Sequence, residues 1–413
     1  MVLKGHPAER IRGVKSDLLK DKRIILGVTG SIGAVECVKL ARELIRHGAE
    51  VQAVMTPAAE EIIAPASLQF ATGRDVITKI GGDVEHVAFA GEWEGRWDLL
   101  LIAPSTANTI GKIAAGIDDT PVTTFATVAL GSGMPILIAP AMHSAMYKNP
   151  AVLKNIEYLK SVGIKFIPPR EEEGKEKFPD IDVILDYVVR VLRDGGGGGR
   201  RALLIGGASE EAIDDMRVIS NRSSGETARE LARELFREGY DLTVLWGRSE
   251  VEPPKVGSLK RFRSMFDLLA LLDNISEEDF NLIAVPAALS DFTIDKVAGK
   301  IPSSRPPVLK LKSAPKVLSQ LRELFPKATI LAFKAVGGDN EKELETSAMS
   351  LIEKKMADYV AGNLLQDVKE GETRIRLYNR RGEIGLFEGM KWKVIRDLVK
   401  TIAAMEVGNE EKK

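Results

Sequence analysis

Residues 217–225 concentrate groups that bind anions. The segment reads RVISNRSSG and supplies two guanidinium groups, one amide and three hydroxyls directly ahead of a helical pattern. Guanidinium groups form paired hydrogen bonds with phosphates and carboxylates, and the free N–H groups at a helix start favour an anion. An ordinary polar loop rarely collects so many of these groups. We therefore interpret the segment as a loop that binds a phosphate and a carboxylate together.

Two turns in the first half of the chain also offer hydrogen-bond donors ahead of a helix. They are residues 29–33 (TGSIG) and residues 103–108 (APSTAN). The first has neither GxGxxG spacing nor the spacing of a Walker loop, so a mononucleotide such as a flavin phosphate fits better than a dinucleotide. A plain structural turn and ordinary helix caps would explain the same residues, and both interpretations stay open here. The candidate ligand-binding residues are Thr29, Gly30, Ser31, Ile32, Ser105, Thr106 and Asn108.

Four histidines are the candidates for a base near neutral pH: His6, His47, His86 and His143. We expect His6, near the N-terminus, and His47, at the end of a helical pattern, to be structural. His86 leads into a probable strand and His143 follows another, so these two are the candidate catalytic histidines.

Composition excludes several functional classes. A formal net charge of -1 provides no broad field for a nucleic-acid backbone, so we expect no nucleic-acid partner. Cys37 is the only cysteine, which excludes an internal disulfide and a zinc site built on several thiolates and fits a reducing cytoplasm. Because residues 3–23 are charged throughout, we expect no secretory signal there, and no stretch approaches the roughly 20 apolar residues that a membrane span needs.

Strand and helix patterns alternate along both halves of the chain. The expected strands of the first half are residues 23–28, 51–55, 99–103 and 134–139, with a helix at 34–47. Those of the second half are residues 202–205, 242–245, 282–285, 329–333 and 358–362, with a helix at 227–238. This alternation predicts an α/β chain of two doubly wound, mainly parallel, Rossmann-like domains.

Five consecutive glycines separate the two halves, and no helix or strand interior tolerates such a run cheaply. The sequence therefore predicts an N-terminal tail or helix at residues 1–22, a first domain at 23–194, a linker at 195–199 and a second domain at 200–413.

The first half resembles the flavin-containing cysteine decarboxylases, in particular those of the bifunctional, archaeal-like phosphopantothenoylcysteine decarboxylase/phosphopantothenate-cysteine ligases. The matching features are TGSI at 29–32, VMTP at 54–57, SLQ at 67–69, His86, residues 103–117, PAM at 140–142 and Met146. The resemblance implies a flavoprotein-like fold with FMN, which oxidises the substrate thiol so that carbon dioxide leaves easily. It also implies that His86 handles the thiol proton, that Thr56 and Ser67 help to bind FMN, and that Met142 contacts substrate.

Two features depart from that family. Bacterial relatives have an asparagine at the position of His143, where its amide holds the substrate carboxylate; a histidine can still donate a hydrogen bond there. Those relatives also carry a cysteine on a flap that corresponds to residues 171–177, where this chain has none. We expect Cys37 to be a buried apolar filler instead. In those relatives the flap cysteine assists reduction of the ene-thiol that forms after carbon dioxide leaves. This step must therefore proceed differently here, or the chain has a different activity.

The second half resembles the phosphopantothenate-cysteine ligases, through ISNRSSG at 219–225 and the segments 287–292, 299–301, 313–317, 332–334 and Asn363. The resemblance implies that CTP activates the phosphopantothenate carboxylate as an acyl-cytidylate, which the cysteine amine attacks. Asn221 would stabilise that intermediate, Arg217 would hold substrate and Lys300 would promote conversion of the intermediate. Lys334, with Lys354 or Lys355, would lie near the triphosphate, and Asp291 near Mg²⁺ or the ribose. The other expected substrate- or nucleotide-binding residues are Ser223, Ser224, Gly225, Ala287, Pro315, Lys316, Val317, Phe333 and Asn363.

We therefore expect a cytoplasmic bifunctional enzyme of coenzyme A biosynthesis with small-molecule substrates, and a homo-oligomer with trimer- and dimer-forming domains as in its relatives. One alternative is a regulatory protein that keeps the flavin fold without decarboxylase activity. A nicotinamide-dependent reductase is disfavoured because neither early turn has dinucleotide spacing.

Overall fold

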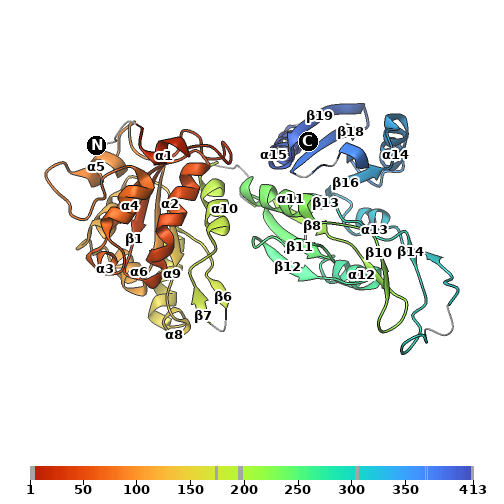
Figure 1. Ribbon diagram of the computed structural model, residues 1–413, viewed down its shortest axis with the longest axis horizontal. Helices are drawn as coiled ribbons and strands as arrows, with labels where there is room; N and C mark the ends of the chain where they lie inside the picture. Colours follow the sequence, from red (N-terminus) through yellow and green to blue (C-terminus); the bar gives the residue numbers. More distant parts are fainter. Residues whose placement is uncertain are drawn as a thin grey trace. The chain divides into compact units, whose positions relative to one another are not determined.

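The computed structural model describes residues 5–172, 175–193, 199–302, 307–367, 369 and 371–410. It consists of two compact units, Met1–Asp194 and Gly195–Lys413 (Figure 1). Residues 195–198 of the predicted linker, and residues 173 and 174 of the segment compared with the flap, lie outside the described residues. None of the described helices is long and apolar enough to cross a membrane.

The first unit contains a five-stranded parallel sheet in the order β2-β1-β3-β4-β5. Its strands are β1 Arg23–Val28, β2 Glu50–Met55, β3 Leu99–Ser105, β4 Ile136–Pro140 and β5 Lys165–Phe166. Ile24 and Leu26 of β1 enter one core, and Ile25 enters the other, because successive side chains of a strand point to opposite faces. The strands are apolar along their length because both faces of the sheet are covered.

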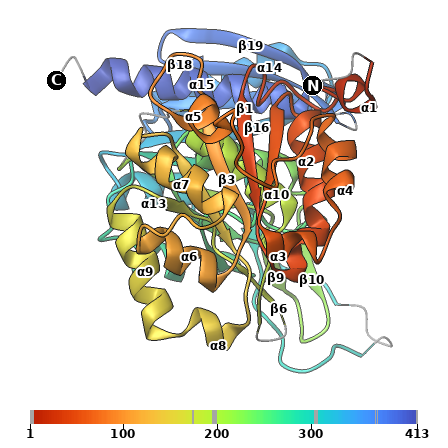
Figure 2. The same cartoon turned by 90° about the vertical axis from the view of Figure 1, so that its left-hand side faces the viewer.

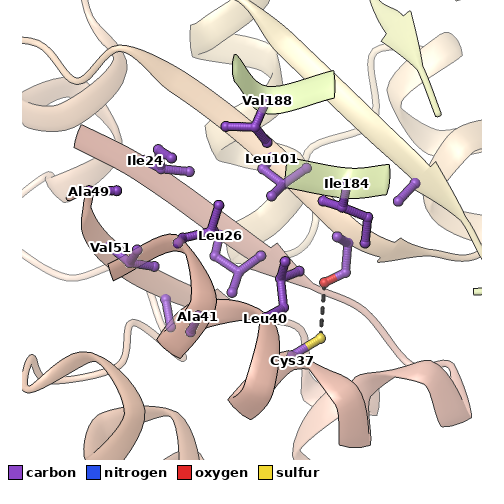
Figure 3. Packing of buried hydrophobic residues seen from close by; sticks show 14 of the residues in the cluster. Ile24, Leu26, Cys37, Leu40, Ala41, Ala49, Val51, Leu101, Ile184 and Val188 are labelled. Atoms are coloured by element: carbon purple, nitrogen blue, oxygen red, sulfur yellow. Dashed lines mark hydrogen bonds between the residues drawn. The ribbon is translucent and has the colours of Figure 1, made fainter. Parts of the chain in front are cut away.

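Helices cover the two faces of this sheet. Core residues of α2 Cys37–Arg46, α4 Pro65–Thr72 and α10 Ile181–Leu192 pack on one face. Figure 3 shows those of α2 and α10. Those of α5 Glu85–Ala90, α6 Ala107–Ala114, α7 Pro121–Gly131 and α9 Pro150–Ser161 pack on the other. Figure 2 shows α2 and α4 on one side of β1 and β3, with α6, α7 and α9 on the other. The short elements are α1 Pro7–Arg10, η1 Ile32–Glu36, α3 Pro57–Glu60, α8 Ser144–Tyr147, β6 Arg170–Glu172 and β7 Lys175–Lys177.

The second unit contains an eight-stranded sheet in the order β12-β11-β8-β13-β16-β17-β18-β19. Its strands are β8 Arg201–Gly206, β11 Asp241–Trp246, β12 Ser258–Arg261, β13 Leu282–Val285, β16 Thr329–Val336, β17 Tyr359–Leu364, β18 Glu372–Asn379 and β19 Gly382–Met390. The strands from β12 to β17 pair in parallel, whereas β18 and β19 are antiparallel.

Five helices and two small hairpins complete the described part of the second unit. The helices are α11 Glu226–Arg237, α12 Met265–Asn274, α13 Val317–Leu324, α14 Glu341–Glu353 and α15 Lys391–Glu410, with the short turn η2 Leu365–Asp367. One hairpin pairs β9 Glu210–Ala212 with β10 Val218–Ser220, and the other pairs β14 Phe292–Thr293 with β15 Lys312–Ser313. Residues of α12, α13 and α14 share one core cluster with the sheet.

The predicted fold class is confirmed: both units are α/β, with a parallel sheet in the first unit and a mainly parallel one in the second. Two details differ from expectation. The helix expected at residues 34–47 is split into η1 and α2, and the second sheet ends in an antiparallel pair. The predicted N-terminal tail or helix contains α1 and packs on the first unit. Ala8 and Leu19 are buried in the first core, and the Gly13 amide donates to the Ile45 carbonyl over 3.0 Å.

Candidate active sites

Hydrogen bonds join the turns that follow the strands of the first sheet. The Thr29 hydroxyl, after β1, donates to the Pro104 carbonyl over 2.8 Å and accepts from the Thr106 amide over 3.2 Å, so it ties the turns after β1 and β3 together. The Ala141 amide, after β4, donates to the Ser105 carbonyl over 2.9 Å. The carboxyl ends of parallel strands form the usual ligand-binding edge of such a sheet, and here three of its turns meet.

Some of the predicted ligand-binding residues serve as helix caps. Ser31 caps η1, Thr56 caps α3 and Thr106 caps α6, where its hydroxyl accepts the Thr109 amide over 3.3 Å. Asn108 lies exposed in the first turn of α6. The capping interpretation is thus correct for the side chain of Thr106, and Ser31 and Thr56 also cap helices. The backbone amides of these three residues are hydrogen-bonded within the unit, to the Thr29 hydroxyl, the Thr29 carbonyl and the Val28 carbonyl respectively.

Ser105 fits a bound anion more directly, and Gly30 is required by the packing of the same region. The Ser105 side chain is fully buried, and among the described residues its Oγ has no hydrogen-bond partner. A buried hydroxyl without a partner is uncommon and points to a missing ligand or water. At Gly30 a Cβ atom would lie 2.6 Å from Cβ of Ala58, so only glycine allows α3 to pack this closely against the turn. Ile32 beside it is 77% exposed.

Ser67 and Met142 are two further predicted site residues of the first unit, Ser67 for FMN and Met142 for substrate. Ser67 lies in the first turn of α4, where no side-chain hydrogen bond links it to the three turns among the described residues. Met142 follows β4 and is half-buried against the core that includes α6 and α7.

The two candidate catalytic histidines have different surroundings. His86 lies in α5, half-buried, with its ring 6.4 Å from the ring of Phe125 in an edge-to-face arrangement. Its Nδ1 is buried and has no partner within the described part of the chain. His143 is exposed just beyond β4, and its Nδ1 accepts the Ala145 amide over 3.3 Å. In neutral His143 this contact leaves the proton on Nε2, which can donate to a ligand.

Cys37 is buried, as expected, and its Sγ donates to the Ala103 carbonyl over 3.1 Å (Figure 3). Burial, followed by the nearby negative charge of Glu36, raises the pKa of this thiol. The side chain therefore stays a thiol and acts as part of the core.

Asn221 joins two loops at the carboxyl edge of the second sheet. Its Nδ2 donates to the Ala288 carbonyl over 3.3 Å and to the Leu289 carbonyl over 2.9 Å, so the segment after β10 is held against the segment after β13. Ser209, which the sequence did not single out, strengthens this junction because its buried Oγ accepts the Ser290 amide over 3.0 Å. Ala287 lies half-buried in the same segment.

Gly225 forms the start of α11 and requires glycine. Its φ is +82°, and a Cβ atom there would lie 2.7 Å from Cβ of Ser249. The neighbouring Ser224 carbonyl accepts the amides of Glu250 and Val251, each over 3.1 Å. Ser223 and Ser224 are thereby held at the N-terminus of a twelve-residue helix.

Arg217 is paired with a carboxylate that sequence reasoning missed. Asp214 has a fully buried side chain and accepts hydrogen bonds from the amides of Met216, Arg217 and Ile301 and from the Arg217 guanidinium. Burial acts to raise its pKa, but these hydrogen bonds outweigh burial and hold the pKa at about 2. The only signal in the sequence was an aspartate three residues before an arginine, a spacing that suits a local turn.

The residues predicted to bind the nucleotide also lie at the carboxyl edge of the second sheet, with one exception. Asp291 forms an ion pair of 2.8 Å with Lys316, and the Ala314 amide donates to the Asp291 carbonyl, so Asp291 lies beside the start of α13, where Pro315 and Val317 are. Among the described residues no three His, Cys, Asp or Glu side chains form a metal-binding group. The charge of the Asp291 carboxylate is instead balanced by the ammonium group of Lys316.

Phe333 and Lys334 lie toward the carboxyl end of β16, and Asn363 lies at the matching position of β17, opposite Ala335. Lys334 is exposed, and Phe333 and Asn363 are half-buried. These three positions belong to the same edge as Asn221.

Lys354 is the exception, and its assignment is corrected. It is the C-cap of α14, five residues before β17 begins. The next residue, Lys355, accepts a hydrogen bond from Arg322, which also pairs with Asp358 at the amino end of β17. The helix carries the chain back to the amino edge before the strand starts, so Lys354 lies at the opposite edge from Lys334.

Similarity to known proteins covers both units. Residues 13–193 match the Flavoprotein family, and residues 198–405 match the family described as DNA/pantothenate metabolism flavoprotein C-terminal domain. The chain is 44% identical over 377 residues to the coenzyme A biosynthesis bifunctional protein CoaBC of Thermococcus kodakarensis, covering 91% of this chain and 93% of that protein. This chain belongs to the CoaBC family.

The CoaBC protein of Methanocaldococcus jannaschii is 36% identical over 400 residues, covering 96% of this chain and 97% of that protein. Among solved structures, the FMN-dependent cysteine decarboxylase SpaF is 31% identical, covers 40% of this chain and 94% of its own, and has a TM-score of 0.36. The predicted family is confirmed, and the matches extend through both units of this chain.

Proposed function

We propose that this CoaBC family member catalyses two steps of coenzyme A biosynthesis at two separate sites. The second unit joins 4′-phosphopantothenate to cysteine with CTP, through an acyl-cytidylate. The first unit then decarboxylates 4′-phosphopantothenoylcysteine to 4′-phosphopantetheine with FMN. One observation carries the proposal: a chain 44% identical to a bifunctional relative over 91% of its length gathers polar groups at the carboxyl edge of each of its two sheets.

The turns of the first unit suit the phosphate and polar edge of FMN. The Ser105 hydroxyl, which has no partner among the described residues, fits such a group, and Thr29, Gly30, Ser31, Thr106 and Asn108 stand at the same turns. When bound, FMN supplies the two-electron acceptor that activates the substrate for loss of carbon dioxide. His86 then handles the thiol proton, and Nε2 of His143 donates a hydrogen bond to the substrate carboxylate.

The second site must turn a carboxylate into an acyl group with a good leaving group. The anionic carboxylate must approach the anionic triphosphate, and negative charge builds up on the departing pyrophosphate; fixed cations and donors at the site would stabilise this charge. Arg217 holds the substrate, Asn221 stabilises the acyl-nucleotide, Lys300 promotes conversion of that intermediate, and Lys334 offsets the charge of the triphosphate. Mg²⁺ bound near Asp291 would release that carboxylate from Lys316.

Product analysis tests both steps. The purified chain is incubated with 4′-phosphopantothenate, cysteine and each nucleoside triphosphate in turn, and the products are identified by mass. We expect amide formation with CTP and a further loss of 44 Da, roughly the mass of carbon dioxide, when FMN is bound. Amide without decarboxylation would favour a regulatory flavin-fold role for the first unit, an alternative motivated by the absence of cysteine from residues 171–177. No amide with any nucleotide would refute the proposal.

We further propose that the enzyme acts in the cytoplasm as a homo-oligomer, with small molecules as its ligands. The single cysteine, buried and reduced, fits that compartment.

A further inference from the structure

The loop between β9 and β10 is fastened to the segment that contains Lys300. Its two consecutive aspartates act on either side of that lysine. The buried Asp214 carboxylate accepts the Ile301 amide over 3.1 Å, and the exposed Asp215 carboxylate accepts the Gly299 amide over 3.1 Å. The Asp215 amide also donates to the Gly299 carbonyl over 3.2 Å. The backbone of Lys300 is therefore fixed from both neighbours.

Asp214 also fixes Arg217. The Arg217 guanidinium donates to Oδ2 of Asp214 and to the Ile301 carbonyl, the latter over 3.3 Å. The Asp214 side chain is 0% exposed, whereas the Arg217 side chain is 43% exposed. One face of the guanidinium is thus anchored while the remainder is accessible to a ligand.

A carboxylate is an unusual side chain to bury unless its hydrogen bonds are satisfied. Asp214 receives three backbone amides and one guanidinium, and each of these donors belongs to the two segments that carry Arg217 and Lys300. An apolar residue could fill the same space but could not orient those donors. The arrangement suits a residue that sets the relative position of two cationic groups before substrate arrives.

We propose that Asp214 is a positioning residue for ligation: it holds the Arg217 guanidinium and the backbone at Lys300 in one arrangement, and Asp215 supports it from the other side of Lys300. The inference rests on the proposed ligase function. Asp214 contacts no substrate; it acts through Arg217 and Lys300.

The test uses the full chain and two reactions. Asp214→Asn keeps the size of the side chain but removes the charge and replaces one acceptor oxygen by a donor. We expect kcat/KM for ligation with respect to 4′-phosphopantothenate to fall by about 10- to 100-fold, the effect of displacing a reacting group by a fraction of an ångström. The KM for the nucleotide should stay within about twofold, and so should decarboxylation of 4′-phosphopantothenoylcysteine in the first unit.

Two companion variants make the result decisive. Asp215→Asn, on the exposed side, should lower ligation by less than Asp214→Asn does. Asp279→Asn removes an exposed carboxylate just ahead of β13, at the amino edge, and should leave both reactions unchanged. Ligation by Asp214→Asn within about twofold of the unsubstituted chain would overturn the proposal. So would an equal fall in both reactions, because that is the result of a purely structural role. If the unsubstituted chain makes no amide, the proposed function fails instead.

Discussion

At the residue scale, Asn221 shows how one side chain serves both structure and chemistry. Its amide nitrogen binds two carbonyls of the segment after β13. We expect Asn221→Ala to lower kcat for ligation by about 100-fold or more, the usual effect of losing a donor that stabilises a charged intermediate, while decarboxylation is spared. Asn221→Asp should be at least as inactive, because a carboxylate would face two carbonyl oxygens. The measurement is the rate of amide formation under saturating CTP. Equal ligation by Asn221→Ala and the unsubstituted chain would rule the role out.

Asp214 gives a prediction for pH. Its folded pKa of about 2 lies below the ordinary value of 3.8, so its stabilising contribution is complete above about pH 4 and is lost as the pH falls toward 2. We expect hydrogen exchange of the segment at residues 210–220, corrected for intrinsic rates, to be constant from pH 5 to 8 and to accelerate below pH 4. Asp214→Asn should exchange faster at pH 7 and lack that step. A step in the variant would point to another group.

At the scale of secondary structure, the Thr29 hydroxyl is what connects two turns. Thr29→Val keeps the side-chain shape but leaves the Pro104 carbonyl and the Thr106 amide without this partner. We expect a loss of about 1–3 kcal/mol in the free energy of unfolding of the first unit and about tenfold weaker FMN binding. Urea unfolding and a flavin titration measure the two effects. Thr127→Val, an exposed threonine of α7, is the matched control and should change stability by less than about 0.5 kcal/mol.

The hairpin of β9 and β10 was not predicted from the sequence, and its loop carries Asp214. Each strand has three residues, too few for an alternating pattern to be recognised, and their pairing depends on a turn built around Asp214. The antiparallel strands β18 and β19 were missed as well. Charged residues such as Arg374 and Glu388 face each other there, which resembles a polar surface more than a strand.

At the scale of the whole molecule, two activities in two units should be separable. His86→Ala should lower decarboxylation by about 100- to 10,000-fold, the range for loss of a general acid or base, and leave ligation unchanged. Asn221→Ala should do the reverse. An equimolar mixture of the two variants should then convert 4′-phosphopantothenate fully to 4′-phosphopantetheine, because the amide product can diffuse from one chain to another. Loss of both reactions in either folded variant would contradict independent sites.

The sequence by itself determined the fold class and the family of both halves. Long apolar strands such as β1 and β3, followed by helices, are local patterns that survive in any context, and the ISNRSSG loop is recognisable without its surroundings. The sequence also placed Cys37 correctly in the core. Within α2, Cys37 shares one apolar face with Leu40, Ala41 and Leu44.

Only the tertiary structure decided which residues meet. Thr29 reaches Pro104 across 75 positions, and Asn221 reaches Leu289 across 68, distances at which a sequence pattern carries no information about contact. The path of the chain likewise separates Lys354 from Lys334, since an intervening helix carries it to the other edge of the sheet. The proposed role of Asp214 depends on its burial and on its hydrogen bonds to Ile301 and Arg217, and burial of a charged side chain is a property of the folded chain alone.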